Sequence, residues 1–414
     1  MKLKQTKAAK KARRRTITVL VSFLLFVALV VGMGFGISAL RTRYLEKKAK
    51  EEREASAAAA EAKMDALDHY IADMTLEEKI AQMFLVTPET LTDSAVVTSS
   101  GDQVRTALSK YPVGGLLYRS TNMTSEEQTK EMLSSAQKIM TTLSKTPLFL
   151  AVTEEGGSNS PVSNSLQLTR FPAAYTYASS ETGVEDLNRD MSEMGQELTG
   201  LGFNLNLMPY SNCADLSDAT IGTRSYGEDY TKTAELVSTV VKGLHGSGLA
   251  TAMKYFPTSG VQDTSGRLIS DKTVTDLETY DMLPFKAGIS AETDIVIVGH
   301  VQVEALDAGV PADLSSNVIG KLLRTELAYD GIVMTAPLSD AAAGSTKEGQ
   351  LAVKAVQAGC DMIFGVDDLE ESVSAIKEAV SSGLIKEKQI DASVKRILTA
   401  KVKRGIMDEP VTTK

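Results

Sequence analysis

The chain has 414 residues, enough for one large domain or two ordinary ones, and 43% of them are hydrophobic, as in a globular protein with a substantial core. Its net charge is −9, but residues 1–15 carry eight basic and no acidic side chains, so the rest of the chain carries −17. Such an acidic remainder argues against nucleic-acid binding. Two cysteines, Cys213 and Cys360, are too few for a disulfide framework.

The first elements expected along the chain are a membrane anchor and its basic flank. Residues 16–40 contain no charged side chain, and these 25 residues exceed the ~20 that a helix needs to cross a bilayer. The basic segment 1–15 predicts a cytoplasmic N-terminus, with everything after residue 40 outside the cell membrane. The apolar run is too long for a signal-peptide core and lacks a good cleavage site, which predicts an uncleaved, single-pass anchor.

A helical stalk is predicted over residues 41–73. Its part 46–63 is charged and rich in Ala, without Gly or Pro, so that strong helix formers dominate it. No repeating apolar a and d positions occur there, which argues against a coiled coil. An interaction scaffold that works through this stalk is one function that the sequence leaves open.

From residue 74 to residue 408, short apolar runs alternate with amphipathic segments, which is typical of parallel strands joined by crossover helices. Eight such units predict an α/β fold of the TIM-type (β/α)8 barrel class, followed by a short tail, 409–414. An open doubly wound sheet is the alternative, but no glycine-rich dinucleotide fingerprint follows the first strand. The expected strands are 83–86, 114–118, 148–152, 203–207, 250–256, 295–298, 332–335 and 361–366.

Six short segments of this region stand out as motifs: 74–83 (MTLEEKIAQM), 154–157 (EEGG), 221–227 (IGTRSYG), 254–257 (KYFP), 299–301 (GHV) and 358–362 (AGCDM). Together they resemble the N-terminal barrel of glycoside hydrolase family 3, above all its β-N-acetylglucosaminidase (β-N-acetylhexosaminidase) branch. The resemblance implies retaining hydrolysis by an Asp nucleophile after the seventh strand and by an acid/base His, held by an Asp, after the fifth. Glycoside hydrolysis needs such a pair because the leaving oxygen must be protonated while a carboxylate supports the oxocarbenium-like centre.

Both catalytic positions implied by the resemblance are changed in this chain. Ala336 stands where the nucleophilic Asp is expected, and the loop after the fifth strand, 258–271, contains no His. The fallback carboxylates are Asp340, four residues beyond Ala336, and Asp263 and Asp271 in the fifth-strand loop. Each also has an ordinary interpretation, because acids favour helix N-termini and Asp is common in loops for turn formation.

The sugar-binding positions implied by the resemblance are partly kept. Arg224, Lys254 and His300 match the family pattern, and Tyr255 and Glu154 complete the candidate set of remnant binding residues. Adjacent strand residues point to opposite faces, so Glu154 and the residue after it cannot both face one ligand. The structural alternative is that these charges pair with strand-end carbonyls and carboxylates, as buried charges must. The changed positions are Thr153, Ser158, Thr223 and Tyr255, where the family has Asp, Arg, Asp and His.

The leading hypothesis is therefore a membrane-anchored, extracytoplasmic barrel that has lost hydrolysis and binds a cell-wall glycan, such as peptidoglycan, or an envelope protein. The alternative is an active β-N-acetylglucosaminidase with relocated carboxylates. No cofactor is expected, since no His, Cys or Asp cluster has metal-ligand spacing. The expected partners are a glycan or envelope protein and the membrane, and no nucleic acid.

Overall fold

The structure is a computed structural model that describes residues 45, 47, 48, 50, 66–144, 146–218, 221–341 and 346–410. The predicted cytoplasmic segment 1–15 and membrane segment 16–40 lie outside the described residues, as does most of 41–65 in the predicted stalk. Within the part that is described, no helix is long and apolar enough to cross a membrane. Residues 66–72 are helical and belong to the compact unit Ala66–Lys414.

Eight parallel strands form the centre of this unit, as the sequence predicted. Their order in the sheet is β10-β8-β5-β4-β3-β2-β1-β11. A parallel bridge between Met334 and Met362 joins β10 to β11, so the two edges of the sheet meet and the barrel closes. The strands are β1 (Phe84–Val86), β2 (Gly115–Leu117), β3 (Phe149–Val152), β4 (Leu205–Asn206), β5 (Ala250–Phe256), β8 (Ile295–Val298), β10 (Ile332–Thr335) and β11 (Ile363–Phe364).

Each of the eight barrel strands lies inside one of the predicted apolar runs. Almost every strand residue is buried, because side chains fill the barrel on one face and helices cover the other. The last strand is shorter than predicted, since β11 covers only two residues of the run 361–366. The TIM-type barrel is therefore confirmed for the described residues.

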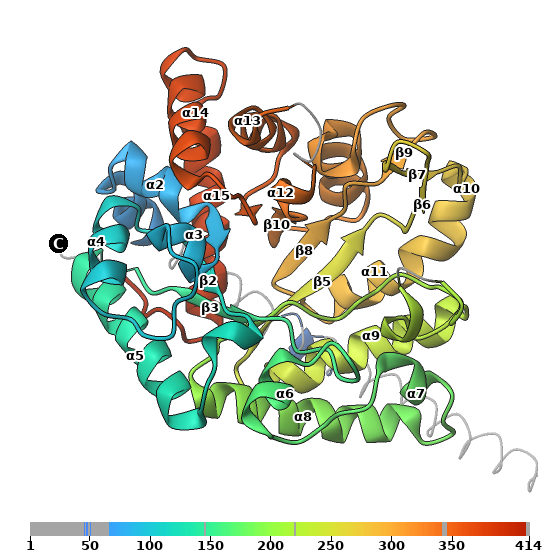
Figure 1. Ribbon diagram of the computed structural model, residues 1–414. Helices are drawn as coiled ribbons and strands as arrows, with labels where there is room; N and C mark the ends of the chain where they lie inside the picture. The colour runs from blue at the N-terminus through green and yellow to red at the C-terminus, as the bar shows by residue number, and fades with distance from the viewer. Residues whose placement is uncertain are drawn as a thin grey trace, which may run out of the picture. The chain divides into compact units, whose positions relative to one another are not determined.

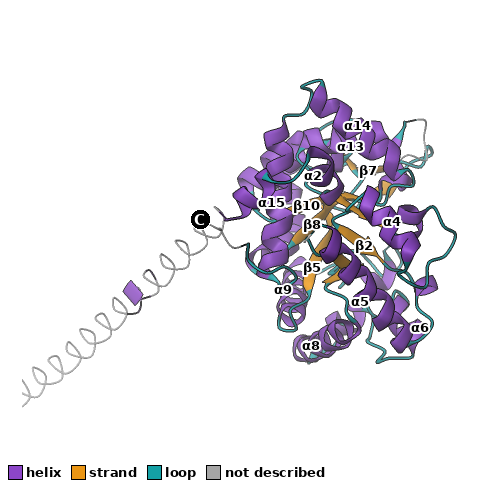
Figure 2. Cartoon of the chain, turned by 90° about the vertical axis from the view of Figure 1, so that its left-hand side faces the viewer, coloured by secondary structure: helices purple, strands orange, loops and turns teal. Residues whose placement is uncertain are grey.

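Helices surround the strands on the outside of the barrel (Figure 1), and Figure 2 shows the strands enclosed by them in a second view. The last helix, α15, completes this layer. The helices are α2 (Leu76–Gln82), α3 (Pro88–Thr92), α4 (Asp102–Lys110), η1 (Ser120–Asn122), α5 (Glu126–Leu143), α6 (Pro161–Leu166), α7 (Ala174–Ala178), α8 (Gly183–Leu201), η2 (Gly222–Arg224), α9 (Tyr230–His245), α10 (Val274–Asp276), η3 (Leu277–Asp281), α11 (Met282–Ser290), η4 (Ala312–Leu314), η5 (Asn317–Glu326), α12 (Leu338–Ala341), α13 (Glu348–Ala358), α14 (Leu369–Ser381) and α15 (Glu387–Lys403).

Local signals set several of these helix ends. Thr75 and Glu78 form a reciprocal capping box at the start of α2, which satisfies two backbone donors that would otherwise lack partners. Gly359 ends α13 with a φ of 112°, a left-handed conformation that glycine adopts without the steric penalty of a side chain. Gly359 thus lets the chain pass from α13 to β11, which begins at Ile363, through a short connection.

A second, small sheet was not predicted. The loop after β5 folds into a hairpin of β6 (Val261–Gln262) and β7 (Leu268–Ser270), and β7 pairs in parallel with β9 (Gln302–Val303) after β8. The three strands lie together in Figure 1. They are two or three residues long, too short for a period-two pattern to appear in the sequence. This sheet fixes the course of the loop in which the family resemblance places the acid/base His.

Candidate functional site

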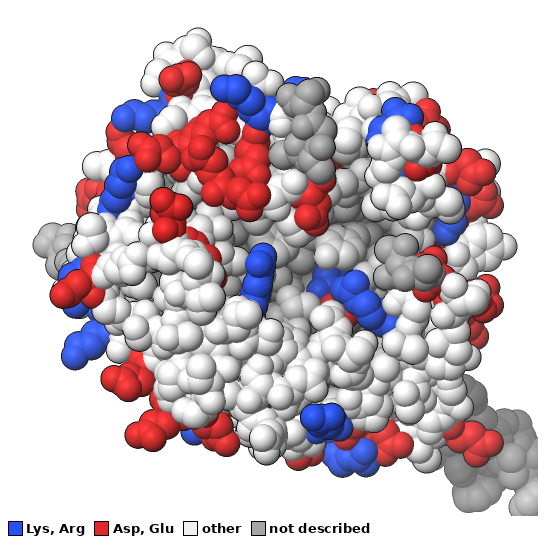
Figure 3. All heavy atoms as spheres, in the orientation of Figure 1, with Lys and Arg blue, Asp and Glu red and all other residues white. Residues whose placement is uncertain are grey.

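The ends of the barrel strands bring together most of the predicted binding residues. Arg224 ends η2, after β4, Lys254 lies near the end of β5, and His300 follows β8. In a parallel barrel these strand ends form one face, and the loops leaving them carry functional side chains. The face drawn in Figure 3 is hollowed near its centre, with basic side chains in and beside the hollow and acidic ones near α13 and α14.

A buried carboxylate, Glu155, joins two of the predicted cations. Arg224 donates from Nε and Nη2 to its two oxygens at 2.7 and 2.8 Å, and Lys254 Nζ lies 2.6 Å from Oε1. The Lys254 ammonium also donates to the backbone carbonyl of Leu207. The forked guanidinium and the carboxylate form a bidentate pair, the strongest arrangement available to these groups. We call Glu155, Arg224 and Lys254 the Glu155 cluster.

The electrostatics of the Glu155 cluster favour the ionised carboxylate. Burial by itself would raise the pKa of Glu155, but the nearby charges of Lys254 and Arg224 outweigh it and lower that pKa to about 2. Burial lowers the pKa of Lys254; the Glu155 carboxylate opposes this effect, and the nearby Arg224 charge adds to it. The cluster therefore contains one negative charge and two positive ones, and burial works against the second cation.

Two tyrosines and an asparagine hold this cluster in place. The guanidinium carbon of Arg224 lies 4.6 Å from the ring centre of Tyr210, which packs edge-on against Tyr255 at 5.9 Å. Asn212 accepts a hydrogen bond from the Tyr255 N–H and donates to its carbonyl. The Arg224 plane is thus fixed on an aromatic surface.

Glu154 faces away from these groups. Its carboxylate accepts hydrogen bonds from the backbone N–H of Val162 and from the hydroxyl of Ser163, at the start of α6. Burial raises the pKa of Glu154, and the bonds to Ser163 and Val162 oppose that rise. The sequence hypothesis placed Glu154 with the binding residues, whereas in the structure its neighbour Glu155 contacts Arg224 and Lys254. The opposite orientation of adjacent residues, which the sequence predicted, separates the two carboxylates.

His300 makes a different set of contacts. Its Nδ1 lies 2.8 Å from Oδ2 of the fully buried Asp313 in η4, and its Nε2 donates to the carbonyl of Pro337 at 2.8 Å. Burial opposes the charge on His300, but Asp313 and the Pro337 carbonyl outweigh it and raise the His300 pKa. His300 therefore links the loops after β8 and β10.

The seventh-strand end offers no carboxylate at the strand itself. Ala336 is 4% exposed, and its N–H donates to the Val298 carbonyl, which extends the pairing of β10 with β8. Asp340 is exposed in α12, three residues beyond Pro337. Burial is the main cause of the raised pKa of Tyr255, and the negative charge of Asp340 adds a smaller rise to the pKa values of both Tyr255 and His300. Asp340 thus acts electrostatically on the same end of the barrel.

The two acidic candidates of the fifth-strand loop have unlike surroundings. Asp263 accepts hydrogen bonds from Ser265 and from Arg267 across the β6–β7 turn, and these bonds lower its pKa. Such contacts are those of a turn-forming Asp. Asp271 is exposed just after β7. In the same loop, Thr258 and Lys272 both bind the buried carboxylate of Asp281.

The model of the glycosyl hydrolase family 3 N terminal domain matches residues 75–400. The chain belongs to glycoside hydrolase family 3. Among its relatives is the beta-hexosaminidase LpqI of Mycobacterium tuberculosis, 29% identical over 339 residues that cover 78% of this chain and 82% of LpqI. A beta-N-acetylglucosaminidase/beta-glucosidase of Cellulomonas fimi is 25% identical over 352 residues, which cover 81% of this chain and 59% of that protein.

Solved structures of family 3 proteins agree with the fold. A family 3 beta-N-acetylglucosaminidase from Paenibacillus is 29% identical and matches with a TM-score of 0.74, over 82% of this chain and 65% of that one. The structure of LpqI matches with a TM-score of 0.69 at 24% identity, over 81% of this chain and 96% of LpqI. This chain therefore spans about two thirds or less of the Cellulomonas and Paenibacillus relatives.

Within this family 3 barrel, sequence reasoning missed two acidic residues. Glu155 was set aside in favour of Glu154, although strand alternation shows only that one of the two faces the site. Asp313 carries no motif and follows His300 by thirteen residues, so only the folded loop brings it to the imidazole. No group of three His, Cys, Asp or Glu side chains in the described residues could hold a metal ion.

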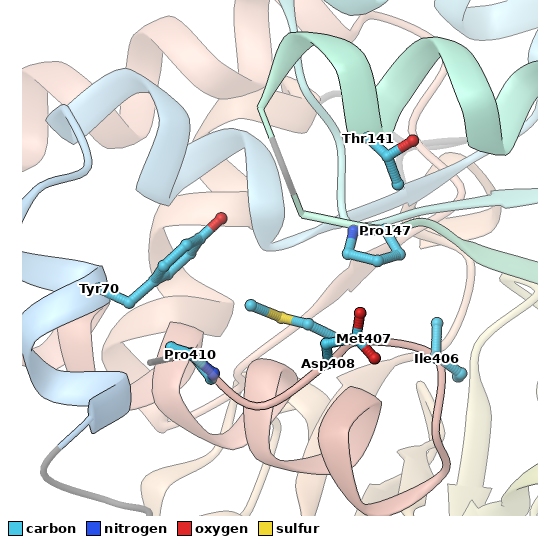
Figure 4. A pocket seen from close by; sticks show the side chains of 7 residues that line it. All are labelled: Tyr70, Thr141, Pro147, Ile406, Met407, Asp408 and Pro410. Atoms are coloured by element: carbon cyan, nitrogen blue, oxygen red, sulfur yellow. The ribbon is translucent and has the colours of Figure 1, made fainter. Parts of the chain in front are cut away.

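A separate pocket of about 350 Å³ lies at the other end of the family 3 barrel. Pro147 precedes β3 and Met407 follows α15, so the pocket is near the strand starts rather than the strand ends. Figure 4 shows Tyr70, Asp408 and other side chains around it, and none of them is a predicted site residue. This pocket is distinct from the Glu155 cluster.

Proposed function

We propose that this chain is a family 3 barrel that binds a glycan without hydrolysing it. The observation that carries the proposal is the end of β10, where Ala336 and Pro337 stand in place of an acidic nucleophile. The relatives named beta-hexosaminidase or beta-N-acetylglucosaminidase make a glycan with N-acetylated amino sugars the first ligand class to test. We further propose that residues 16–40 anchor the barrel outside the cell membrane.

The chemistry of the strand ends supports a loss of hydrolysis. A methyl group at Ala336 cannot attack the sugar carbon or stabilise its developing positive charge. Pro337 packs against Gly365, where an added Cβ would lie 2.9 Å from the Cβ of Pro337, so the segment has little room to rearrange. A positioned acid/base typically contributes 10²–10⁴-fold to the rate, and the β6–β7 hairpin has no His to supply it.

Turnover of an aryl N-acetyl-β-glucosaminide by the full chain tests this proposal. We expect wild-type turnover at background, and higher turnover by Ala336→Asp, because an aryl leaving group needs little protonation once a nucleophile is present. Wild-type activity well above background that Ala336→Asp leaves unimproved would contradict the loss of hydrolysis. A fluorescence or calorimetric titration of the same glycan without the aryl group measures binding separately.

An active glycosidase with a relocated carboxylate is the second candidate. The observation in its favour is that Asp340 is exposed at the start of α12, three residues beyond Pro337, whose carbonyl accepts a hydrogen bond from His300. Asp340→Asn distinguishes the two candidates. It should abolish turnover if Asp340 is the catalytic group and leave it at background if hydrolysis has been lost.

Cell fractionation tests the proposed anchor. The full chain should appear with membranes, and a chain lacking residues 1–40 should not. The third hypothesis, a scaffold that acts through the stalk, predicts that deletion of residues 46–63 abolishes partner binding while glycan binding by the barrel persists. Membrane association of the chain without residues 1–40 would argue against the anchor.

A further inference from the structure

The C-terminal end of α15 is tied to the barrel through a histidine. Arg404, which follows α15, donates from Nε to Oδ1 of Asp294 at 2.7 Å and from Nη2 to Nδ1 of His245 at 3.0 Å. His245 ends α9, and its Nε2 lies 3.0 Å from Oδ2 of the same Asp294. The side chains of His245, Asp294 and Arg404 are only 12%, 1% and 10% exposed. We call these three residues the His245 network.

The partners of His245 determine which of its two ring nitrogens carries a hydrogen. A guanidinium can only donate hydrogen bonds, and a carboxylate can only accept them. Nδ1 must therefore be the acceptor for Arg404, and Nε2 carries the hydrogen that points to Asp294 and to the Thr251 hydroxyl, which lies 3.1 Å away. The imidazole is thus neutral in this arrangement, and the charges of Asp294 and Arg404 balance one to one.

A second hydrogen on His245 is incompatible with this arrangement. An imidazolium donates from both nitrogens and accepts at neither, so its formation removes an acceptor of Arg404 and places two cations side by side. Arginine cannot release its own proton, and the single carboxylate of Asp294 balances only one of the two cations. Arg404 lies beyond the last turn of α15 and can turn toward water, whereas the imidazole is held between Thr251 and Asp294. Acid should therefore displace Arg404.

The other charged groups around His245 do not replace the lost bond. Glu292 and Lys403 form an exposed ion pair at 3.1 Å, and Lys242 is in the last turn of α9. The Glu292 carbonyl lies 3.4 Å from Arg404 Nη2, which is long for a hydrogen bond. Among the described residues, no further ionisable side chain pairs with the imidazole. The bond from Arg404 to His245 is thus the contact at this end of α15 that depends on the charge of the imidazole.

The segment that follows Arg404 forms part of the wall of the pocket at the strand starts (Figure 4). The N–H groups of Ile406 and Met407 both donate to the Lys401 carbonyl, which joins this wall to the last turn of α15. A displacement of Arg404 should therefore loosen the pocket wall as well. Four of the seven residues that line the pocket belong to this segment, namely Ile406, Met407, Asp408 and Pro410.

We propose that the His245 network is a pH-dependent latch, in which protonation of His245 releases Arg404 and loosens residues 404–410 at the pocket of the strand starts. The latch lies at the other end of the barrel from the candidate glycan site and does not depend on the proposed function. Imidazoles in water take up a proton near pH 6.5, so the change is expected between about pH 7.5 and 5.5.

Hydrogen exchange of the full chain at pH 7.5 and pH 5.5 tests the latch. Dividing the intrinsic rate of an unstructured peptide by each measured rate gives a protection factor, which removes the pH dependence of the exchange chemistry itself. We expect the protection of residues 405–407 to fall about two- to tenfold at pH 5.5, the factor that corresponds to one hydrogen bond of ordinary strength. Helix α14, which contains no histidine, should keep its protection. Unchanged protection of residues 405–407 would overturn the proposal.

The chain has three histidines, and replacing each by glutamine assigns the response to one of them. His245→Gln keeps an acceptor for Arg404 and a donor for Asp294 but does not titrate, so it should hold residues 405–407 protected at both pH values. The matched controls are His69→Gln, at an exposed position of the helix 66–72, and His300→Gln at the strand ends. Both should retain the fall in protection. A fall that survives His245→Gln would contradict the latch.

Nitrogen NMR of the wild-type chain with labelled histidines provides a second test if His245→Gln does not fold. At pH 7.5 the His245 ring should carry its hydrogen on Nε2 and none on Nδ1. On acidification, the midpoint of its protonation should coincide with the midpoint of the loss of protection at residues 405–407. A hydrogen on Nδ1 at pH 7.5, or two midpoints that differ clearly, would overturn the proposal.

Discussion

Two buried clusters at opposite ends of the barrel have the same charges but different hydrogen bonding. At the strand starts, Asp361 pairs with Arg324 and Arg396, and at the strand ends Glu155 pairs with Arg224 and Lys254. Each cluster has one carboxylate and two cations. A charge count alone would therefore assign a ligand to both.

The donors distinguish the two clusters. The Arg324 guanidinium also donates to the carbonyls of Tyr329 and Gly331, and Asp361 accepts further bonds from Ser393 and from the Val333 N–H. The chain itself thus satisfies the cluster at the strand starts and joins η5, β10 and α15 through it. In the Glu155 cluster, Arg224 binds the Glu155 carboxylate and also contacts the Tyr255 side chain, and the Arg224 side chain is 29% exposed. The first cluster therefore serves stability, whereas the second lies at the strand ends, where the loops of such barrels carry functional side chains.

The largest effect is expected from Asp361→Asn. It leaves two arginines near the strand starts without a counter-charge, and arginine cannot release its proton in a protein. Removing one partner of a buried ion pair typically costs about 3–5 kcal/mol. Urea or guanidinium unfolding of the full chain should show a loss of this size.

Glu155→Gln is the matched variant in the other cluster. It should lower the free energy of unfolding clearly less than Asp361→Asn does. Lys254 can become neutral when its counter-charge is removed, and Arg224 is partly in contact with water. Equal losses in the two variants would mean that the cluster at the strand ends is as essential to stability as the one at the strand starts.

Glu370→Ala, which breaks the exposed pair with Lys110, should change stability by less than about 1 kcal/mol.

The sequence predicted the barrel far better than these clusters. Short apolar runs such as 295–298 and 332–335 predict their strands directly, because consecutive apolar residues in the sequence indicate a buried strand. Arg324, Arg396 and Asp361 come from three elements, and no local pattern indicates that they meet. An Asp just before a buried run, as at Asp294 and Asp361, is the one available signal, since it can accept hydrogen bonds at the strand start.

The candidate site was only partly predicted, because its residues also come from separate elements of the chain. Arg224 and Lys254 lie in recognisable motifs at strand ends, and they do meet in the structure. Their common partner, Glu155, required a choice between two adjacent residues that strand alternation alone does not make. Asp313, the carboxylate that contacts His300, is positioned by the short helix η4. The position of η4 depends on contacts between residues that are distant in the sequence.

A further prediction concerns Lys401, a buried cation near the strand starts whose hydrogen-bond partner is uncharged. It is fully buried in α15, and its ammonium donates to the Gln82 side chain, which carries no charge. Burial lowers the Lys401 pKa to about 7. The unfolded chain binds a proton there up to about pH 10.4, so Lys401 makes stability rise between about pH 7 and 10, by roughly 1.4 kcal/mol per pH unit.

Lys401→Met should therefore stabilise the chain by about 1–4 kcal/mol at pH 7, because a residue of similar length removes the buried charge. The measurement is unfolding free energy at pH 7 and pH 9 for both chains. The gain should shrink at the higher pH, where the wild-type amine is already neutral in the folded state. A loss of stability in Lys401→Met would show that the bond to Gln82 outweighs the cost of burial.

Among the buried groups, the smallest effect on stability is expected at the strand ends, from His300. Its pKa is raised by Asp313 against burial, so the folded chain holds this proton more tightly than the unfolded chain. The resulting stability is fully present below the unfolded pKa of about 6.5 and is lost as the pH rises through the raised pKa, the opposite of the trend at Lys401. His300→Gln can still donate to the Pro337 carbonyl but does not titrate, and should lower stability by about 1–2 kcal/mol at pH 6.

The two opposite trends can be separated in the Lys401→Met background, where the rise with pH is removed. In that background, stability should fall above pH 6.5, and His300→Gln should remove the fall. A fall that persists in the double variant would assign it to another group.

Because His300 ties the loops after β8 and β10, hydrogen exchange of residues 336–341 should quicken in His300→Gln, while that of residues 397–403 should not. Equal changes in both segments would mean that the two ends of the barrel are coupled rather than independent.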